Sequence, residues 1–248
     1  MKKSILLTAI VLLSVSCKEK AKEEVEETEA MTETTTEENQ DELITLFDGT
    51  SMENWRGYLM EEMPAEWSIE DGAMAFTPGE QGGKNIISKD TFTNFVLSID
   101  WKISEGGNSG IFWGVFEDPK FPEAYQTGPE IQVLDDAKHP DSFVGEGTHK
   151  AGALYDMIAP GNLEAVHPAN EWNTCIIEVN HTTNQGKVTL NGTEIVTFPV
   201  NGEAWGAMVA NSKFKDWEGF GKYPTGHIAL QDHGDKVWYK NIKIKKLD

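Results

Sequence analysis

Residues 187–196 carry the strongest structural signal in the chain and read Lys187-Val188-Thr189-Leu190-Asn191-Gly192-Thr193-Glu194-Ile195-Val196. The pair Asn-Gly supplies the two positive φ angles of a type I′ turn, and apolar residues alternate with polar ones on both sides of it. Because side chains alternate between the faces of a strand, the pattern predicts a β-hairpin with one buried face. A further hairpin is expected just before it, from a strand at 174–180 and a turn at 181–186.

Outward from this hairpin, short strand-like runs separated by glycine and proline recur over residues 43–248. These runs are Ala73–Phe76, Asn94–Ile103, Gly110–Phe116, Glu130–Leu134, Ala153–Met157, Trp172–Asn180, Lys187–Leu190, Glu194–Phe198, His227–Gln231 and Val237–Lys245. No long helical period is found there, and residues 211–221 are expected to form a loop. Many short strands with turn signals between them indicate an all-β sandwich or jelly roll.

Residues 1–16 have the pattern of a bacterial lipoprotein signal peptide. Lys2 and Lys3 precede an apolar run, Ile5–Leu13, which is far shorter than the roughly 20 residues that span a bilayer. Small residues before Cys17 resemble a lipobox, so we expect Cys17 to carry lipid and anchor the protein in the cell envelope, at the outer membrane. An ordinary signal peptide with an incidental cysteine is the alternative.

The charge of the chain restricts its partners. Residues 17–42 hold eleven acidic residues against three lysines and no aromatic residue, which predicts a disordered tether. The whole chain has a net charge of −20, and Arg56 is its one arginine. Nucleic acid and anionic membrane surfaces are therefore excluded as partners, apart from the lipid anchor, and a neutral or cationic substrate is expected.

The second cysteine, Cys175, lies in a strand-like run and predicts a buried structural thiol, not a nucleophile. If Cys17 carries lipid, no intrachain disulfide can form.

The run 128–136 places polar residues within an apolar strand. Ile131 and Val133 look like the core side, which puts Glu130 and Gln132 about 7 Å apart on an open or concave face. A solvated edge strand is the alternative.

Two other runs concentrate polar groups. In residues 228–235, His233 stands among carboxylates and can exchange protons near neutral pH, although a turn role for it remains open. In residues 106–114, Trp113 offers a flat face for stacking against a sugar, although a core role remains open.

The sequence requires no cofactor. No metal-ligand spacing is found among His139, His149, His167, His181 and His227, so no transition-metal site is expected. A divalent cation could still bind to exposed carboxylates such as Asp135, Asp136 and Asp232.

Several motifs, in order along the domain, resemble the 3-keto-disaccharide hydrolase family. They are Phe47-Asp48-Gly49 with Trp55, Asn108-Ser109-Gly110-Ile111, Gly128-Pro129-Glu130-Ile131-Gln132-Val133-Leu134-Asp135, Gly152-Ala153-Leu154-Tyr155, Glu171-Trp172-Asn173 and Leu230-Gln231-Asp232-His233-Gly234. The resemblance implies a concanavalin A-like jelly roll, a β-sandwich of two antiparallel sheets whose concave face binds glycan. It also implies hydrolysis of glycosides whose sugar carries a ketone at carbon 3.

A ketone at carbon 3 acidifies the proton at carbon 2, so one base can start an elimination that water addition completes. Glu130 or His233 is the expected base, with Asp135 nearby. The residues expected to contact the sugar are Asn108, Trp113, Gln132, Tyr155, Gln231 and Asp232. The expected partners are a small 3-keto-glycoside and an oxidoreductase that supplies it.

Two other classes of function stay open. A conventional retaining glycosidase needs two carboxylates about 5–5.5 Å apart. Gln132 and Leu134 stand where related sandwich enzymes place further carboxylates on the same strand. A non-catalytic carbohydrate-binding module would use the same sheet without turnover.

Overall fold

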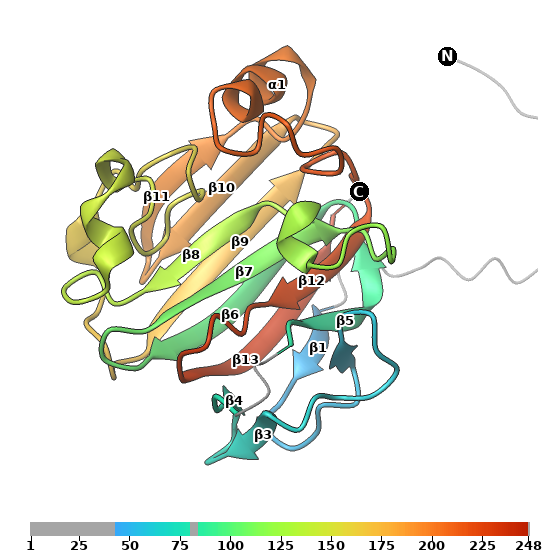
Figure 1. Ribbon diagram of the computed structural model, residues 1–248, viewed down its shortest axis with the longest axis vertical. Helices are drawn as coiled ribbons and strands as arrows, with labels where there is room; N and C mark the ends of the chain where they lie inside the picture. Colours follow the sequence, from blue (N-terminus) through green and yellow to red (C-terminus); the bar gives the residue numbers. More distant parts are fainter. Residues whose placement is uncertain (1–42, 80–83, 248) are drawn as a thin grey trace, which may run out of the picture. The chain divides into compact units, whose positions relative to one another are not determined.

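The structure, a computed structural model, describes residues 43–79 and 84–247. The predicted signal peptide, the lipidation of Cys17 and the acidic tether lie outside the described residues. The described part is built from two β-sheets packed face to face, with every strand pairing antiparallel (Figure 1). The predicted all-β sandwich of two antiparallel sheets is confirmed.

The larger sheet has eight described strands. Their order is β11 (Thr193–Phe198), β10 (Gln185–Leu190), β9 (Asn173–Asn180), β6 (Phe95–Ile103), β13 (Val237–Lys246), β4 (Ala73–Phe76) and β3 (Trp67–Glu70), with β1 (Leu43–Phe47) also paired to β13. The smaller sheet has five, in the order β2 (Trp55–Gly57), β5 (Ile86–Phe92), β12 (Gly226–Leu230), β7 (Asn108–Val115) and β8 (Glu130–Leu134).

The core lies between the two sheets and follows the period of two that the strands require. Buried and half-buried residues alternate along β6 from Phe95 to Ile103, and in β9 buried residues alternate with more exposed ones. Trp55, Trp101 and Tyr239 are among the largest fully buried side chains. Burial of apolar surface on this scale is the main free-energy gain of a sandwich fold.

The predicted 187–196 hairpin is confirmed. Strands β10 and β11 pair antiparallel, with Leu190 opposite Thr193. Asn191 and Gly192 have φ angles of 48° and 83°, as the type I′ turn requires. The preceding hairpin is confirmed by the antiparallel pairing of β9 with β10.

Other elements differ from the sequence-based expectation. Residues 153–157 form isolated bridges at Leu154 instead of a strand, because this segment contacts β8 for only a few residues. Strands β1, β2, β3 and β5 were not predicted from the sequence. Strand β2 has only three residues, and charged residues interrupt β5.

One α-helix was also missed. Helix α1 (Gly202–Ala210) has nine residues and buries only Trp205 in the core, so the sequence shows little amphipathic pattern there. No helix in the described ranges 43–79 and 84–247 is long and apolar enough to cross a bilayer.

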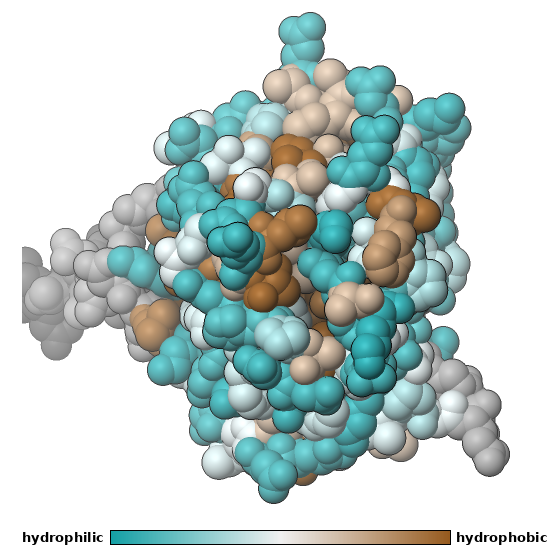
Figure 2. Space-filling view, turned by 90° about the vertical axis from the view of Figure 1, so that its left-hand side faces the viewer, coloured by the Kyte–Doolittle hydropathy of each residue, from teal (hydrophilic) through white to brown (hydrophobic). Residues whose placement is uncertain are grey.

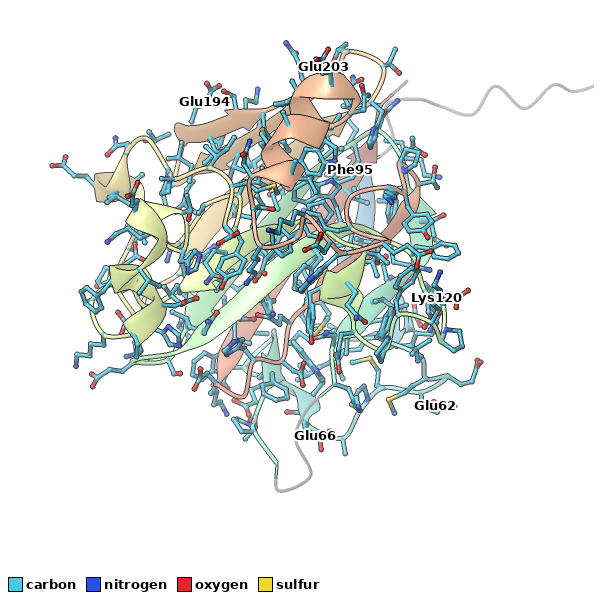
Figure 3. All side chains as sticks on the ribbon, turned by 45° about the horizontal axis from the view of Figure 1, so that its top comes forward. Glu62, Glu66, Phe95, Lys120, Glu194 and Glu203 are labelled. Atoms are coloured by element: carbon cyan, nitrogen blue, oxygen red, sulfur yellow. The ribbon has the colours of Figure 1, made fainter. Side chains whose placement is uncertain are left out.

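In the part of the chain that the structure describes, four 3₁₀ helices lie in the connections: η1 (Ala124–Gln126), η2 (Pro140–Phe143), η3 (Gly145–Gly147) and η4 (Leu163–Ala165). Charged side chains such as Glu62, Glu194 and Glu203 stand at the periphery, whereas Phe95 lies within the sandwich (Figure 3). The face that Figure 2 presents is mostly hydrophilic, with local hydrophobic patches.

Candidate active site

The outer face of the smaller sheet carries a group of buried polar residues. Glu130 and Gln132 of β8 lie opposite Phe112 and Gly110 of β7 in the strand register. Gln231 follows β12, and its backbone N–H donates to the Gly110 carbonyl at 3.0 Å. Three neighbouring strands therefore bring these polar side chains to one place.

The alternation predicted for β8 is confirmed. Ile131 and Val133 belong to the core cluster between the sheets, which leaves Glu130 and Gln132 on the opposite face. Strand β8 lies at the edge of its sheet, as the alternative had it, but it is not solvated: Glu130 is only 7% exposed.

The edge of β8 is covered by the segment that follows η3. Gln132 exchanges backbone hydrogen bonds with this segment: its N–H donates to Ala153 at 3.1 Å, and its carbonyl accepts from Gly152 at 2.8 Å. The Tyr155 N–H donates to the Glu130 carbonyl at 3.0 Å. This short pairing both protects the strand edge and sets Tyr155 beside Glu130.

A pocket of about 250 Å³ opens above these strands. It is lined by Asn108, Tyr125, Glu130, Gln132, Tyr155, Lys213, Phe214, Trp217, Gln231 and His233. Six of these residues were predicted from the sequence, and they come from four separate parts of the chain. Pocket size and lining suit a small polar molecule with one apolar face.

Tyr125, Lys213, Phe214 and Trp217 were missed by the sequence analysis. Trp217 forms an aromatic cluster with Phe214 and Tyr125, at ring-centroid distances of 5.1 Å and 5.8 Å. Residues 211–221 are indeed a loop, as predicted, and this loop forms the aromatic wall. Three aromatic residues within a short polar loop were the one signal that could have indicated it.

Among the described residues that line the pocket, Glu130 is the one carboxylic acid. Burial raises the pKa of Glu130 to about 8. The charge of Lys213 lowers this pKa by a smaller amount, and the charge of Asp141 raises it slightly further. With its amide nitrogen turned toward β7, Gln132 donates to Glu130 Oε1 and to the Ser109 carbonyl at 3.1 Å each. A carboxyl group with such a pKa can take up and release a proton near neutral pH.

Two buried amide oxygens in the pocket have no partner. Neither Asn108 Oδ1 nor Gln231 Oε1 accepts a hydrogen bond from any described residue. Their side chains are 3% and 9% exposed. Since buried polar atoms are nearly always hydrogen-bonded, these oxygens are placed to accept from a bound molecule or its water.

Tyr155 belongs to a hydrogen-bonded chain behind the pocket. Its hydroxyl donates to Asp141 Oδ2 at 3.0 Å, and His149 bridges Asp141 Oδ1 and Asp156 Oδ1 at 3.1 Å and 3.0 Å. Asp156 in turn accepts from the Lys213 backbone N–H at 2.7 Å. The chain fixes the Tyr155 ring and ties the aromatic loop to the segment beside β8.

Asp135 and Trp113 are corrections to the predicted site. Asp135 accepts from the Gly106 N–H at 2.7 Å and from the Ala137 N–H at 3.1 Å, so its carboxylate holds two turns and does not line the pocket. Trp113 is 4% exposed and stacks on Phe198 in the core, because alternation along β7 points it inward. The open alternative of a core role for Trp113 is therefore right.

Asp232 is also outside the pocket lining, although its neighbours Gln231 and His233 belong to it. Its backbone N–H donates to Asn85 Oδ1 at 3.2 Å. Burial raises the pKa of Asp232 to about 6. The prediction that Asp232 contacts the sugar directly therefore does not agree with its position outside the pocket lining.

Cys175 is buried as predicted, and it forms no disulfide. Burial raises the pKa of its thiol to about 12, so it is inert as a nucleophile. Arg56, the single arginine, is held by both carboxylate oxygens of Glu117 at 2.7 Å and 2.6 Å, away from the pocket lining.

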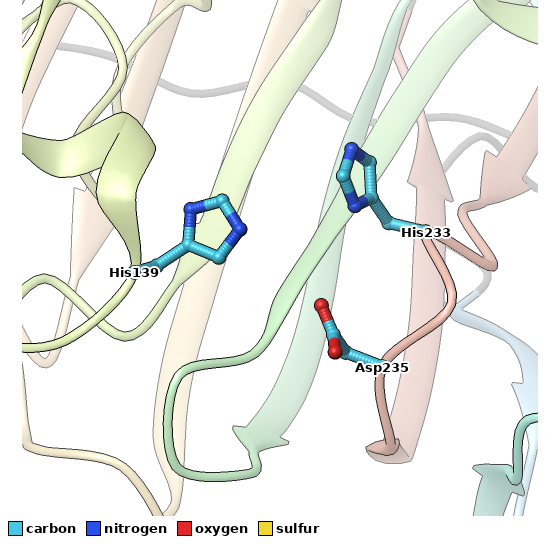
Figure 4. A group of neighbouring side chains, drawn as sticks. All are labelled: His139, His233 and Asp235. Atoms are coloured by element: carbon cyan, nitrogen blue, oxygen red, sulfur yellow. The ribbon is translucent and has the colours of Figure 1, made fainter.

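Within residues 43–79 and 84–247, one group of side chains has a geometry that could hold a metal ion. Ligand atoms of His139, His233 and Asp235 lie within 4.8 Å of one another (Figure 4). The two histidines are far apart in the sequence, so ligand spacing alone could not reveal the group. The expectation that no transition-metal site is supported by histidine spacing stays untested, because the group is a matter of geometry alone.

Comparison with known proteins assigns the chain to a family. Residues 42–245 match the model of the 3-keto-alpha-glucoside-1,2-lyase-like domain. A 3-keto-disaccharide hydrolase from Bacteroides thetaiotaomicron is 36% identical over 235 residues, which cover 84% of this chain and 79% of the relative.

Solved structures agree with this assignment. A crystal structure from Parabacteroides distasonis, classed as a glycosyl hydrolase, is 31% identical in sequence to this chain. The match covers 83% of this chain and 94% of that structure's chain, with a TM-score of 0.74. A second crystal structure of the same class, from the same organism, is 26% identical. The match covers 84% of this chain and 100% of that structure's chain, with a TM-score of 0.63.

Proposed function

Because this chain belongs to the family of 3-keto-alpha-glucoside-1,2-lyase-like domains, we propose that it cleaves glycosidic bonds in sugars oxidised to a ketone at carbon 3. The broader activity, hydrolysis of a glycosidic bond, follows from the family and its curated relative. The keto-sugar route is the finer part of the proposal and is supported by the chemistry of the pocket.

The observation that carries this proposal is the single acid in the pocket. A retaining glycosidase needs a second carboxylate about 5–5.5 Å from the first. Among the residues lining this pocket, Glu130 is the one carboxylic acid, and Gln132 occupies the next position on the same face of β8. One acid with a pKa of about 8 fits a reaction that begins with removal of a single carbon-bound proton.

In the proposed reaction, Glu130 takes the proton from carbon 2 of the 3-keto sugar. The electron pair of that C–H bond forms an enolate whose charge rests on the ketone oxygen. As the ketone re-forms, the electron pair moves into a double bond between carbons 1 and 2, and the C1–O bond breaks while the leaving oxygen takes up the proton that Glu130 has removed. Water then adds across the double bond, so that the net reaction is hydrolysis.

Other pocket residues serve binding and charge stabilisation in this scheme. The cationic Lys213 and Tyr155 line the pocket together with Glu130, and the Tyr155 hydroxyl is held by Asp141. Asn108 Oδ1 and Gln231 Oε1 are free to accept from sugar hydroxyls. The aromatic wall at Trp217 offers the apolar face against which a sugar ring packs.

The test compares a 3-keto disaccharide with the same disaccharide unoxidised, using the full chain and the variant Glu130→Gln. We expect release of the leaving sugar from the keto form alone, and a drop in kcat of about 10²–10⁴-fold in the variant. Glu194→Gln, the same change at an exposed position of β11, is the matched control. Cleavage of the unoxidised sugar would identify a conventional glycosidase, and binding without turnover of either sugar would identify a binding module.

Two further parts of the proposal concern the cell. A 3-keto sugar has to be made by an oxidoreductase acting on the intact glycoside, so such an enzyme is the expected partner. We also propose lipid anchoring at Cys17 in the outer membrane. Incorporation of labelled fatty acid into the wild-type chain but not into Cys17→Ser is the measurement that checks it.

A further inference from the structure

The chain forms a second pocket in addition to the first pocket, which Glu130 lines. It has a volume of about 250 Å³ and is formed by residues from the segments 120–126 and 216–219. Its lining includes Lys120, Phe121, Gln126, Asp216, Trp217 and Glu218. None of the site residues predicted from the sequence belongs to this lining, so the proposed chemistry leaves the second pocket without a role.

The two pockets adjoin at Trp217. This residue lines both of them, and its half-buried indole ring lies 5.8 Å from the Tyr125 ring, centroid to centroid. Tyr125 lines the first pocket, and the next residue, Gln126, lines the second. A molecule bound in the first pocket can therefore extend past Trp217 into the second.

The size of the first pocket favours such an extension. Ligand sites usually measure about 300–1,000 Å³, and the first pocket, at about 250 Å³, lies below this range. It suits a single sugar ring, whereas a glycoside also has a group on the other side of the bond to be broken. The second pocket has the same volume as the first and offers that group a place.

The two segments that form the second pocket are packed against each other. A Cβ placed on Gly219 would lie 2.7 Å from Phe121 Cζ, so the loop backbone already touches the Phe121 ring. An ion pair between Lys120 and Glu218 joins the same two segments, with Lys120 at the periphery of the molecule (Figure 3). The second pocket is thus part of a packed arrangement and is not a gap between unconnected loops.

The charges of the lining favour an uncharged occupant. Lys120 and Glu218 neutralise each other, whereas Asp216 forms no ion pair with any lysine, arginine or histidine of the described residues. The second pocket therefore has a net negative charge, which repels a carboxylate or a phosphate group. Because Asp216 is exposed, salt should screen this repulsion. A neutral sugar meets no repulsion and can pack its apolar face on Trp217.

The geometry points to a subsite for the leaving group: we propose that the sugar released by cleavage binds in the second pocket against Trp217, and that Asp216 makes this subsite select an uncharged sugar over an acidic one. The inference rests on the proposed function, because the leaving group is defined by the bond that is broken beside Glu130. It narrows the substrate to a disaccharide-sized glycoside whose reducing-end sugar has no acidic group.

Three 3-keto glycosides that differ only in the leaving group test the subsite with the full chain. They are a methyl glycoside, a disaccharide with glucose at its reducing end, and a disaccharide with glucuronic acid there. The methyl glycoside has no group for the second pocket, so its KM should be higher than that of the neutral disaccharide. We expect kcat/KM to be about fivefold higher for the neutral than for the acidic disaccharide, which is the size of effect that one exposed charge produces.

The variant Asp216→Asn should bring this ratio of kcat/KM values close to one. Added salt should lower the ratio in the wild type but not in the variant, since only the wild type has the repelling charge. Asp71→Asn, the same change in the exposed turn between β3 and β4, is the matched control and should keep the wild-type ratio. Circular dichroism shows whether each variant is folded.

NMR titration with the two unoxidised disaccharides measures binding separately from the chemistry. Equal kcat/KM for the two keto disaccharides in the wild type, or an unchanged ratio in folded Asp216→Asn protein, would overturn the subsite and leave the proposed function standing. Turnover of none of the keto glycosides would contradict the proposed function. The subsite would still be supported if the neutral disaccharide binds more tightly than the acidic one only while Asp216 is present, and overturned if the two bind alike.

Discussion

The carboxylate of Glu130 lies across the backbone of Gly110 on the neighbouring strand. A Cβ placed on Gly110 would be 2.7 Å from the carboxyl carbon of Glu130 and closer still to Oε1, so any other residue there would displace the acid. Gly110 lies in β7 without a positive φ, and its small size is therefore needed for space and not for backbone freedom. The position of the proposed base thus depends on a glycine of the neighbouring strand.

We expect Gly110→Ala to lower kcat by about 10²-fold, because displacement of a reacting group by about 1 Å has a cost of that order. Steady-state kinetics on the 3-keto disaccharide would measure this loss. Gly206→Ala in α1 is the control, since a Cβ there meets nothing within 4 Å. Unchanged kcat in a folded Gly110→Ala protein would mean that the observed position of Glu130 is not the reacting one.

The pH dependence of activity should follow Glu130. A base has to be ionised, and burial raises the pKa of Glu130 to about 8, so kcat/KM should rise with pH and level off above about 8. The charge of Lys213 lowers this pKa, so Lys213→Met should move the rising limb to higher pH. A rising limb that stays in place in this variant would assign it to another group.

Stability should depend on pH at the same residue. The unfolded chain ionises Glu130 near its ordinary pKa of 4.5, whereas the folded protein does so near 8. Below pH 4.5 Glu130 is neutral in both states and does not change the free energy of unfolding. Between pH 4.5 and about 8 the unfolded chain ionises Glu130 but the folded protein does not, so stability is lost as pH rises through this range. Thermal unfolding should therefore show Glu130→Gln to be more stable than wild type by a few kcal/mol above pH 8, with no gain below 4.5. An equal gain at every pH would contradict the burial of an ionisable acid.

Two tryptophans should respond differently to replacement. Trp113 packs on Phe198 in the core, so Trp113→Ala should lower the free energy of unfolding by about 3–5 kcal/mol. Trp217 is half-buried on the pocket wall, so Trp217→Ala should mainly raise KM with a smaller loss of stability. Denaturant titration and steady-state kinetics of both variants separate the two roles. A large rise in KM for a folded Trp113 variant would restore the sugar-stacking prediction.

The sequence by itself determined the class of fold, the 187–196 hairpin and the polar face of β8. These features are local, because a strand of period two and an Asn-Gly turn depend on residues within a few positions of each other. Alternation along β8 also places Ile131 and Val133 in the core. It therefore places Glu130 and Gln132 on the opposite face of the strand.

The tertiary structure alone decided which distant residues share the pocket. It turned Trp113 into the core and placed Trp217, Phe214 and Lys213 beside Glu130, from a loop about 80 residues further along the chain. It also brought His139 to His233 and Asp235. Such contacts arise from the packing of sheets and the course of loops, for which the sequence carries no local period. The raised pKa of Glu130 is of the same kind, since it results from burial by segments remote in the sequence.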